Sequence, residues 1–149
     1  MSRAPDIVIG GEDRPYLRRW HVIPRNRWLN VYLHQFLRSD DDRALHDHPW
    51  VNVSVLLSGR YFEHTADGQR ILRRPWRPWA PWRLVVRRAT AAHRVELLPD
   101  GISGETPCWS LFLTGPRVRE WGFHCPKGWV PWRDFTAGKH DEMIGKGCE

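Results

Sequence analysis

The sequence is poor in cysteine and has no long apolar run. Its three cysteines, Cys108, Cys125 and Cys148, form no CxxC pair, which argues against a cysteine-rich zinc site and against a disulfide framework. We therefore expect reduced thiols. No apolar stretch approaches the roughly 20 residues that span a bilayer. The polar, glycine- and proline-broken first residues also lack the apolar core of a secretion signal. These absences predict a soluble, cytoplasmic protein without a membrane partner.

The chain also lacks a concentrated block of charge. Its formal net charge is +6, but the arginines that produce it are scattered, in pairs such as Arg18-Arg19 and Arg87-Arg88. Runs of five or six like charges, basic helical stripes and the known DNA- or RNA-binding signatures are all missing. Nucleic acid is therefore not an expected partner, and a small molecule is the expected ligand.

What the sequence does contain is a series of short β-rich segments separated by turn signals, which is typical of an all-β sandwich or barrel. The Asp67-Gly68 pair is a strong hairpin signal between residues 60–65 and 69–74. Further strands are predicted at 27–38, 48–57, 83–88, 93–98, 108–115 and 117–125. The only helical turn that we expect lies near residues 14–20.

The length fits one domain. We expect residues 1–149 to form that single domain, with a core at about 27–125, an N-terminal arm at 1–26 and a C-terminal tail at 126–149.

Two histidines with an i, i+2 spacing stand at the start of the second long strand. Residues two apart in a strand point to the same side, so His46, His48 and Asn52 share one face while Asp47 points away. Two imidazoles on one face can bind a single metal ion. A valine row, which includes Val53, occupies the other face. Such an apolar face needs a cover, which predicts a homodimer.

This pattern resembles the first motif of the cupin superfamily, in which His-x-His is followed after three or four residues by Glu and six residues later by Gly. Here Asn52 stands at the Glu position and Gly59 at the Gly position, while Asp40 stands where the motif usually opens with Gly. The resemblance covers about residues 27–125. It implies a jelly-roll β-barrel with little helix.

The second cupin motif places another histidine on a later strand, and His93 stands at the matching position. Arg88 and Thr90 occupy the places of the usual Pro and Gly, and Leu97 that of the closing Asn. The resemblance thus implies one divalent metal ion bound by His46, His48 and His93.

The loss of the motif carboxylate has a chemical consequence. Three neutral imidazoles leave the double positive charge of the metal uncompensated, which favours an anionic ligand, hydroxide or an oxygen species. Three-His sites suit iron, zinc, nickel or copper, and iron is the metal that we expect first. Asn52 either binds the metal through its carbonyl oxygen or hydrogen-bonds a bound water or substrate.

Among cupins, cysteine dioxygenase and related thiol dioxygenases have three-His iron sites, and the string at residues 45–48 is similar to theirs. In that family an arginine on the strand before the motif pairs with the substrate carboxylate, which implies this role for Arg27. The thioether-forming Cys of that family is absent. Arg60, directly after Gly59, is a second cation that we expect near the site. His34 shares a face with Tyr32 and is either a substrate contact or a core histidine.

Three functions are compatible with these residues. The leading hypothesis is a dioxygenase-like enzyme that oxidises a small polar or anionic substrate with dioxygen. A zinc or nickel cupin that catalyses isomerisation or hydrolysis is the second. The third is a non-catalytic cupin that binds a sugar or metabolite, which the motif departures at Asn52, Arg88 and Thr90 favour.

Overall fold

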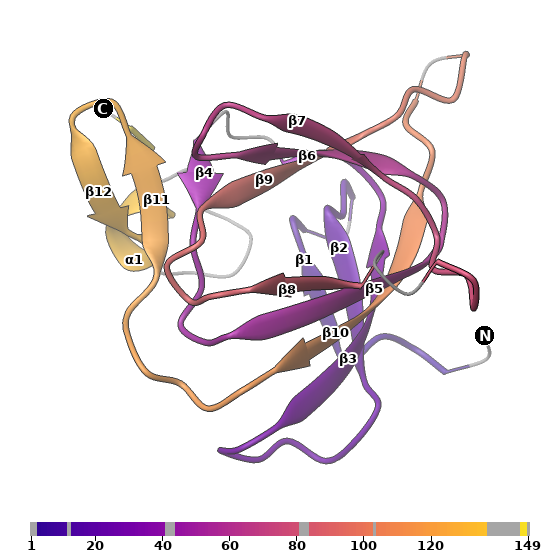
Figure 1. Cartoon of the computed structure of the whole chain (residues 1–149), viewed down its shortest axis with the longest axis horizontal. Coiled ribbons are helices and arrows are strands. Elements are labelled where there is room, and N and C mark those ends of the chain that lie inside the picture. Colours follow the sequence, from indigo (N-terminus) through magenta and orange to yellow (C-terminus); the bar gives the residue numbers. More distant parts are fainter. Residues whose placement is uncertain are drawn as a thin grey trace.

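Two antiparallel sheets enclose the interior of the molecule (Figure 1). The computed structural model describes residues 3–11, 13–40, 44–80, 84–102, 104–136 and 147–148. In Figure 1 strands β6, β7 and β9 lie above strands β3, β5, β8 and β10, and the β11–β12 hairpin stands at one side. The all-β prediction is confirmed.

The first sheet has the order β1-β2-β3-β10-β5-β8. Its strands are β1 (Ile7–Ile9), β2 (Leu17–His21), β3 (Asn30–Phe36), β10 (Cys108–Thr114), β5 (Asn52–Ser58) and β8 (Val85–Arg87). The second sheet has the order β12-β11-β4-β9-β6-β7. Its strands are β12 (Gly128–Pro131), β11 (Gly122–Cys125), β4 (Leu45–His46), β9 (His93–Leu97), β6 (Tyr61–Thr65) and β7 (Arg70–Arg73). One helical turn, α1 (Trp132–Phe135), follows β12.

The predicted hairpin is present as β6 and β7, but the helical turn expected near residues 14–20 is wrong. That segment forms β2, which pairs with β3 from Leu17 opposite Phe36 to His21 opposite Tyr32. Leu17 and Trp20 are both buried and three residues apart, a spacing that suits a helix. In a strand the same odd spacing puts the two side chains on opposite faces, and Trp20 stacks on Trp109. Strands β1 and β2 both come from the segment expected as an arm.

Strand β5 alternates as the sequence predicts. Asn52, Ser54 and Leu56 are buried, whereas Val53 and Val55 between them are partly exposed. Leu56 packs with residues of β6, β9 and β10 in the core cluster Leu56, Tyr61, Val95, Leu97 and Cys108. Gly59 follows the strand with φ +81°, and a Cβ there would lie 2.6 Å from the Cβ of Cys108. Only glycine fits this turn, which is the physical reason for the motif glycine.

A disulfide corrects the expectation of three reduced thiols. Cys125 on β11 is bonded to Cys148, with Cα atoms 5.3 Å apart. Cys108 is a free thiol with no exposed surface. The two bonded cysteines are 23 residues apart in sequence. Their pairing was not visible in the sequence because it depends on how close the two Cα atoms lie in the fold.

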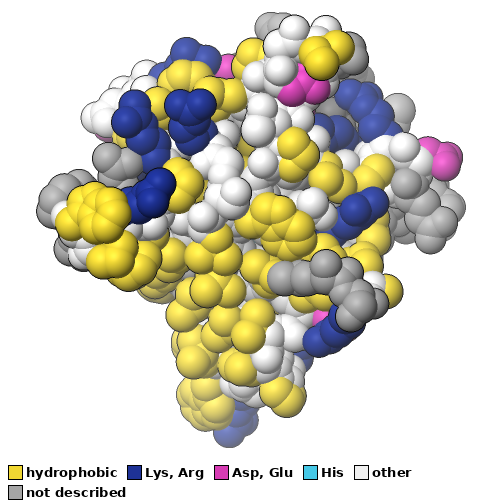
Figure 2. Space-filling view, turned by 90° about the vertical axis from the view of Figure 1, so that its right-hand side faces the viewer, with side chains coloured by type: hydrophobic (Ala, Val, Ile, Leu, Met, Phe, Trp, Pro, Cys, Tyr) yellow, Lys and Arg dark blue, Asp and Glu magenta, His cyan; other side chains and the backbone are white. Residues whose placement is uncertain are grey.

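Hydrophobic side chains remain at the surface. Val51, Val86 and Trp79 are each at least half exposed. Figure 2 shows that such side chains gather over the lower half of the face that it presents, while most arginines and lysines lie above them. None of the helices in the described part of the chain has the length and apolarity needed to cross a bilayer.

Candidate metal centre

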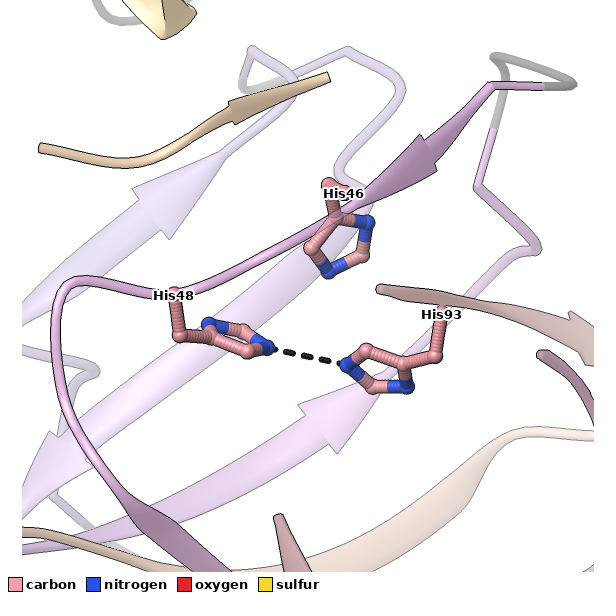
Figure 3. A group of neighbouring side chains, drawn as sticks. All are labelled: His46, His48 and His93. Carbon is pink, nitrogen blue, oxygen red and sulfur yellow. Dashed lines mark hydrogen bonds between the residues drawn. The ribbon is translucent and has the colours of Figure 1, made fainter. Parts of the chain in front are cut away.

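Three histidines from neighbouring segments meet inside the molecule (Figure 3). His46 ends β4 and is the register partner of His93, the first residue of β9. His48 lies two residues beyond the end of β4, and its ring points toward that of His93 (Figure 3). The structure brings one ring nitrogen of each histidine within 4.8 Å of the others. The Nε2 atoms of His48 and His93 are 2.9 Å apart.

Their surroundings keep two of these imidazoles neutral. Burial lowers the pKa of His48 well below its ordinary value, and the neighbouring His46 and His93 lower it further. Burial also lowers the pKa of His93 to about 4, although the carboxylate of Glu63 partly opposes this effect. Metal binding needs deprotonated imidazole nitrogens, so the chemistry of this donor set fits a divalent transition metal.

Glu63 on β6 contacts the outer nitrogen of His93. Its Oε1 atom lies 2.9 Å from His93 Nδ1, so the Nε2 atom of the same ring faces the other two histidines. Only 1% of Glu63 is exposed. Burial alone would raise its pKa, but His93, Arg87 and Arg73 lower it well below the ordinary range. An ionised carboxylate behind a histidine fixes the ring and strengthens it as a metal ligand.

Arg87 connects Glu63 to the inner face of β5. Its Nε donates to Glu63 Oε1 at 2.6 Å, and its Nη1 donates to Ser54 Oγ at 2.9 Å. The Asn52 Oδ1 atom is 3.5 Å from the same Nη1, at the limit of a hydrogen bond. The Nδ2 atom of Asn52 is buried without a hydrogen-bond partner among the described residues. Asn52 therefore lies inside the barrel and has a free donor.

Asp47 lies between two of the histidines in sequence but is not part of the group. Its carboxylate accepts hydrogen bonds from Gly122 N and Trp129 Nε1 and pairs with Arg119 and His124. Burial would raise its pKa, yet these donors lower it. Arg119 also reaches the carbonyl oxygen of His48 at 3.4 Å. The cluster thereby anchors the β11–β12 hairpin to the histidine-bearing segment.

The predicted substrate residues are not gathered in one place. Arg27 is exposed in the loop before β3, with its guanidinium 4.6 Å from the ring centroid of Trp28. Arg60 is exposed between β5 and β6. In the described part of the chain, none of the contacts joins either arginine to the three histidines. His34, by contrast, is buried, and its ring stacks on Phe112, 5.1 Å between centroids.

Sequence reasoning missed Glu63, Arg87 and the partners of Asp47. One signal for Glu63 was available. It stands two residues after Tyr61 in a predicted hairpin strand, so both side chains point to the same side. Both are buried in the structure. A carboxylate on the core side of a strand needs a partner.

Comparison with known proteins identifies the fold. No protein-family model matches the chain, and no curated protein sequence matches it. Among solved structures, the DMSP lyase DddQ from Ruegeria pomeroyi superposes with a TM-score of 0.54 at 14% identity, over 79% of this chain and 57% of that one. KdgF from a Halomonas species superposes with a TM-score of 0.51 at 15% identity, over 72% of this chain and 87% of that one.

A cupin superfamily protein from Desulfitobacterium hafniense gives a TM-score of 0.50 at 11% identity, over 78% of this chain and 84% of that one. A protein from Klebsiella pneumoniae that is described as having a double-stranded β-helix domain gives a TM-score of 0.51 at 15% identity. The match covers 72% of this chain and 83% of that one. These likenesses agree with the two antiparallel sheets of this chain. The chain has the fold of the cupin superfamily, a double-stranded β-helix.

Proposed function

We propose that the chain is a metal-dependent enzyme that acts on a small anionic substrate, with one divalent ion held by His46, His48 and His93. The observation that carries this proposal is the convergence of three imidazole nitrogens within 4.8 Å. Glu63 supports it, because its carboxylate lies 2.9 Å from the far nitrogen of His93, while the near nitrogen faces the other two histidines.

The charge of the site favours an anion. Three neutral ligands leave the charge of a divalent ion uncompensated, and the single carboxylate of Glu63 is shared by Arg73 and Arg87. Ferrous iron is the ion that we propose first. When bound it would supply one-electron chemistry with dioxygen, which makes oxidation of the substrate the leading reaction class. The chain's own residues would hold the metal, orient His93 and attract the anion.

A non-oxidative reaction is the second candidate. It is favoured by the likeness to two structures described as DMSP lyases, at 14% and 17% identity. In this case zinc or nickel would polarise a substrate oxygen or activate water, and turnover would not require dioxygen.

The first test is the metal content of protein purified without chelators. We compare the wild type with a His46→Ala/His93→Ala double variant and with His64→Ala as a matched control. His64 contacts Glu96 on the neighbouring strand and lies outside the three-histidine group. The proposal expects about one equivalent of metal in the wild type and in His64→Ala, and none in the double variant.

The metal found directs the activity assay. Iron calls for oxygen consumption with thiols, carboxylates and diketones, and zinc or nickel calls for anaerobic turnover of the same compounds. Absence of metal from the wild type would refute the enzymatic proposal and favour the non-catalytic binding function. The cytoplasmic location and the homodimer stay predictions.

A further inference from the structure

Arg19 differs from the arginines that pair with acids inside the molecule. Arg73 and Arg87 share the carboxylate of Glu63, and Arg119 pairs with Asp47. Among the described residues, none of the carboxylates lies within ion-pair distance of Arg19. Its side chain is nevertheless partly buried, and burial lowers its pKa. A guanidinium withdrawn from water without a counter-ion is unfavourable unless an anion completes its surroundings.

The guanidinium of Arg19 lies against the inner face of β3. Its Nε donates to His34 Nε2 at 2.9 Å, and its Cζ is 4.8 Å from the ring centroid of Tyr32. Tyr32 and His34 are 5% and 3% exposed, so this face belongs to the interior. The contact with His34 uses one of the five N–H donors that a guanidinium has. Its two terminal amino groups have no hydrogen-bond partner in the described part of the chain.

The same hydrogen bond fixes the protonation of His34. Arginine can only donate, so His34 Nε2 must accept, and the single proton of the neutral ring is then on Nδ1. Burial lowers the pKa of His34 well below its ordinary value, and the charge of Arg19 lowers it further. The Nδ1 atom is buried and has no hydrogen-bond partner among the described residues. His34 thus presents a buried N–H donor that a ligand oxygen could satisfy.

A row of aromatic rings leads from this pair to the candidate metal centre. The His34 ring lies 5.9 Å from that of Tyr32 and 5.1 Å from that of Phe112, with interplanar angles of 13° and 23°. The Phe112 ring is in turn 5.8 Å from the ring of His48. Arg19 and His34 therefore share one wall of the interior with a candidate metal ligand.

We propose that Arg19 and His34 form an anion-binding subsite for a small, polar carboxylic acid, with the carboxylate on the Arg19 guanidinium and an acceptor oxygen on His34 Nδ1–H. The other end of the acid reaches the metal centre. This inference rests on the proposed function and adds to it a substrate class and a binding position. It gives Arg19 the role that the sequence suggested for Arg27 or Arg60.

The test measures ligand binding to protein loaded with Co²⁺, whose visible absorption spectrum changes when an anion enters its coordination sphere. The probes are malonate, succinate and glutarate, each titrated beside its monoamide, in which one carboxylate is replaced by a neutral amide. The ratio of the two dissociation constants isolates the contribution of the second negative charge. Three chain lengths are used so that one of them spans from the metal to Arg19.

The wild type should bind the dicarboxylate of matching length about tenfold or more tightly than its monoamide. Arg19→Met should abolish this preference and still bind one equivalent of Co²⁺. Arg19→Lys, which retains the charge but not the fork of donors, should keep part of the preference. Arg18→Met is the matched control, because Arg18 is the neighbouring arginine on β2 and its side chain is exposed. It should behave like the wild type.

An unchanged preference in Arg19→Met would overturn the inference, as would its loss in Arg27→Met or Arg60→Met instead. If Arg19→Met fails to fold, Arg19→Lys decides the question. A dicarboxylate preference that is weaker in Arg19→Lys than in Arg18→Met, with normal Co²⁺ content in both variants, supports the subsite; equal preferences in the two variants overturn it. Failure of the wild type to bind Co²⁺ would instead refute the proposed function, and the inference would fall with it.

Discussion

Replacing Glu63 with Gln tests whether this carboxylate organises the candidate metal centre. The change keeps the size of the side chain but removes its charge. Arg87, with 5% of its side chain exposed, would lose its carboxylate partner, and so would Arg73, with 24% exposed. Removing one partner of a buried ion pair costs about 3–5 kcal/mol. Arg73 retains contact with water, and Gln can still accept a hydrogen bond. We therefore expect the free energy of unfolding to fall by about 3 kcal/mol, the lower end of this range.

The same change should weaken metal binding. Gln cannot supply the negative charge that lies 2.9 Å from His93 Nδ1. Loss of such a partner typically weakens metal affinity about 10- to 100-fold. Urea unfolding of the metal-free protein measures the stability, and competition with a chromophoric chelator for Zn²⁺ measures the affinity.

Glu96→Gln is the matched control. Glu96 lies on β9, directly opposite β6, and is about a third exposed where it pairs with His64 and Arg70. Glu96→Gln should lower the free energy of unfolding by less than about 1 kcal/mol and leave the affinity for zinc unchanged. If Glu63→Gln unfolded at the wild-type urea concentration and kept the wild-type affinity, the reasoning from its burial and contacts would be refuted.

The pH dependence gives an independent check. The pKa of Glu63 is lowered in the folded chain from its ordinary value of 4.5. The stability that Glu63 contributes is therefore fully present above that value and is lost as the pH falls below it. The difference in unfolding free energy between the wild type and Glu63→Gln should be constant above about pH 5 and should narrow in more acid solution.

Three further predictions concern other parts of the molecule. Asp47→Asn should lower the free energy of unfolding by about 2 kcal/mol, measured in urea, because it leaves buried donors around a neutral amide; an effect within experimental error would contradict this. Before reduction, the native protein should have no thiol that reacts with Ellman's reagent. After mild reduction, Cys125 and Cys148 should react. Cys108 should stay unreactive, because burial raises its pKa to about 12. Val86→Lys, at a residue 63% exposed, should convert the predicted homodimer into a monomer in light scattering; a monomeric wild type would rule the dimer out.

Local sequence signals were sufficient for the all-β fold class and for the pairing of His46 with His48 as candidate ligands. Alternation in β5 and the Asp67-Gly68 turn are local signals, because side-chain direction and turn geometry depend on residues a few positions apart. The spacing of His46 and His48 is equally local. Their meeting with His93 could be expected only from the resemblance to cupins, since 45 residues separate His48 from His93.

The helical turn expected near residues 14–20 was wrong. The pairing of β2 with β3 places Leu17 and Trp20 on opposite faces, and Trp20 stacks on Trp109. Tertiary contacts decided the outcome because strand pairing satisfies the backbone of β2 and packing covers both side chains.

Only the tertiary structure decided which polar groups surround the histidines. Glu63 contacts His93 because β6 pairs with β9, and Arg19 contacts His34 because β2 pairs with β3 in a particular register. The disulfide between Cys125 and Cys148 likewise depends on the tertiary structure, which brings their Cα atoms to 5.3 Å. Sequence periodicity determines on which side of its own strand a residue lies. Which residues of distant strands it meets is determined by strand order and register, which no short stretch of sequence contains.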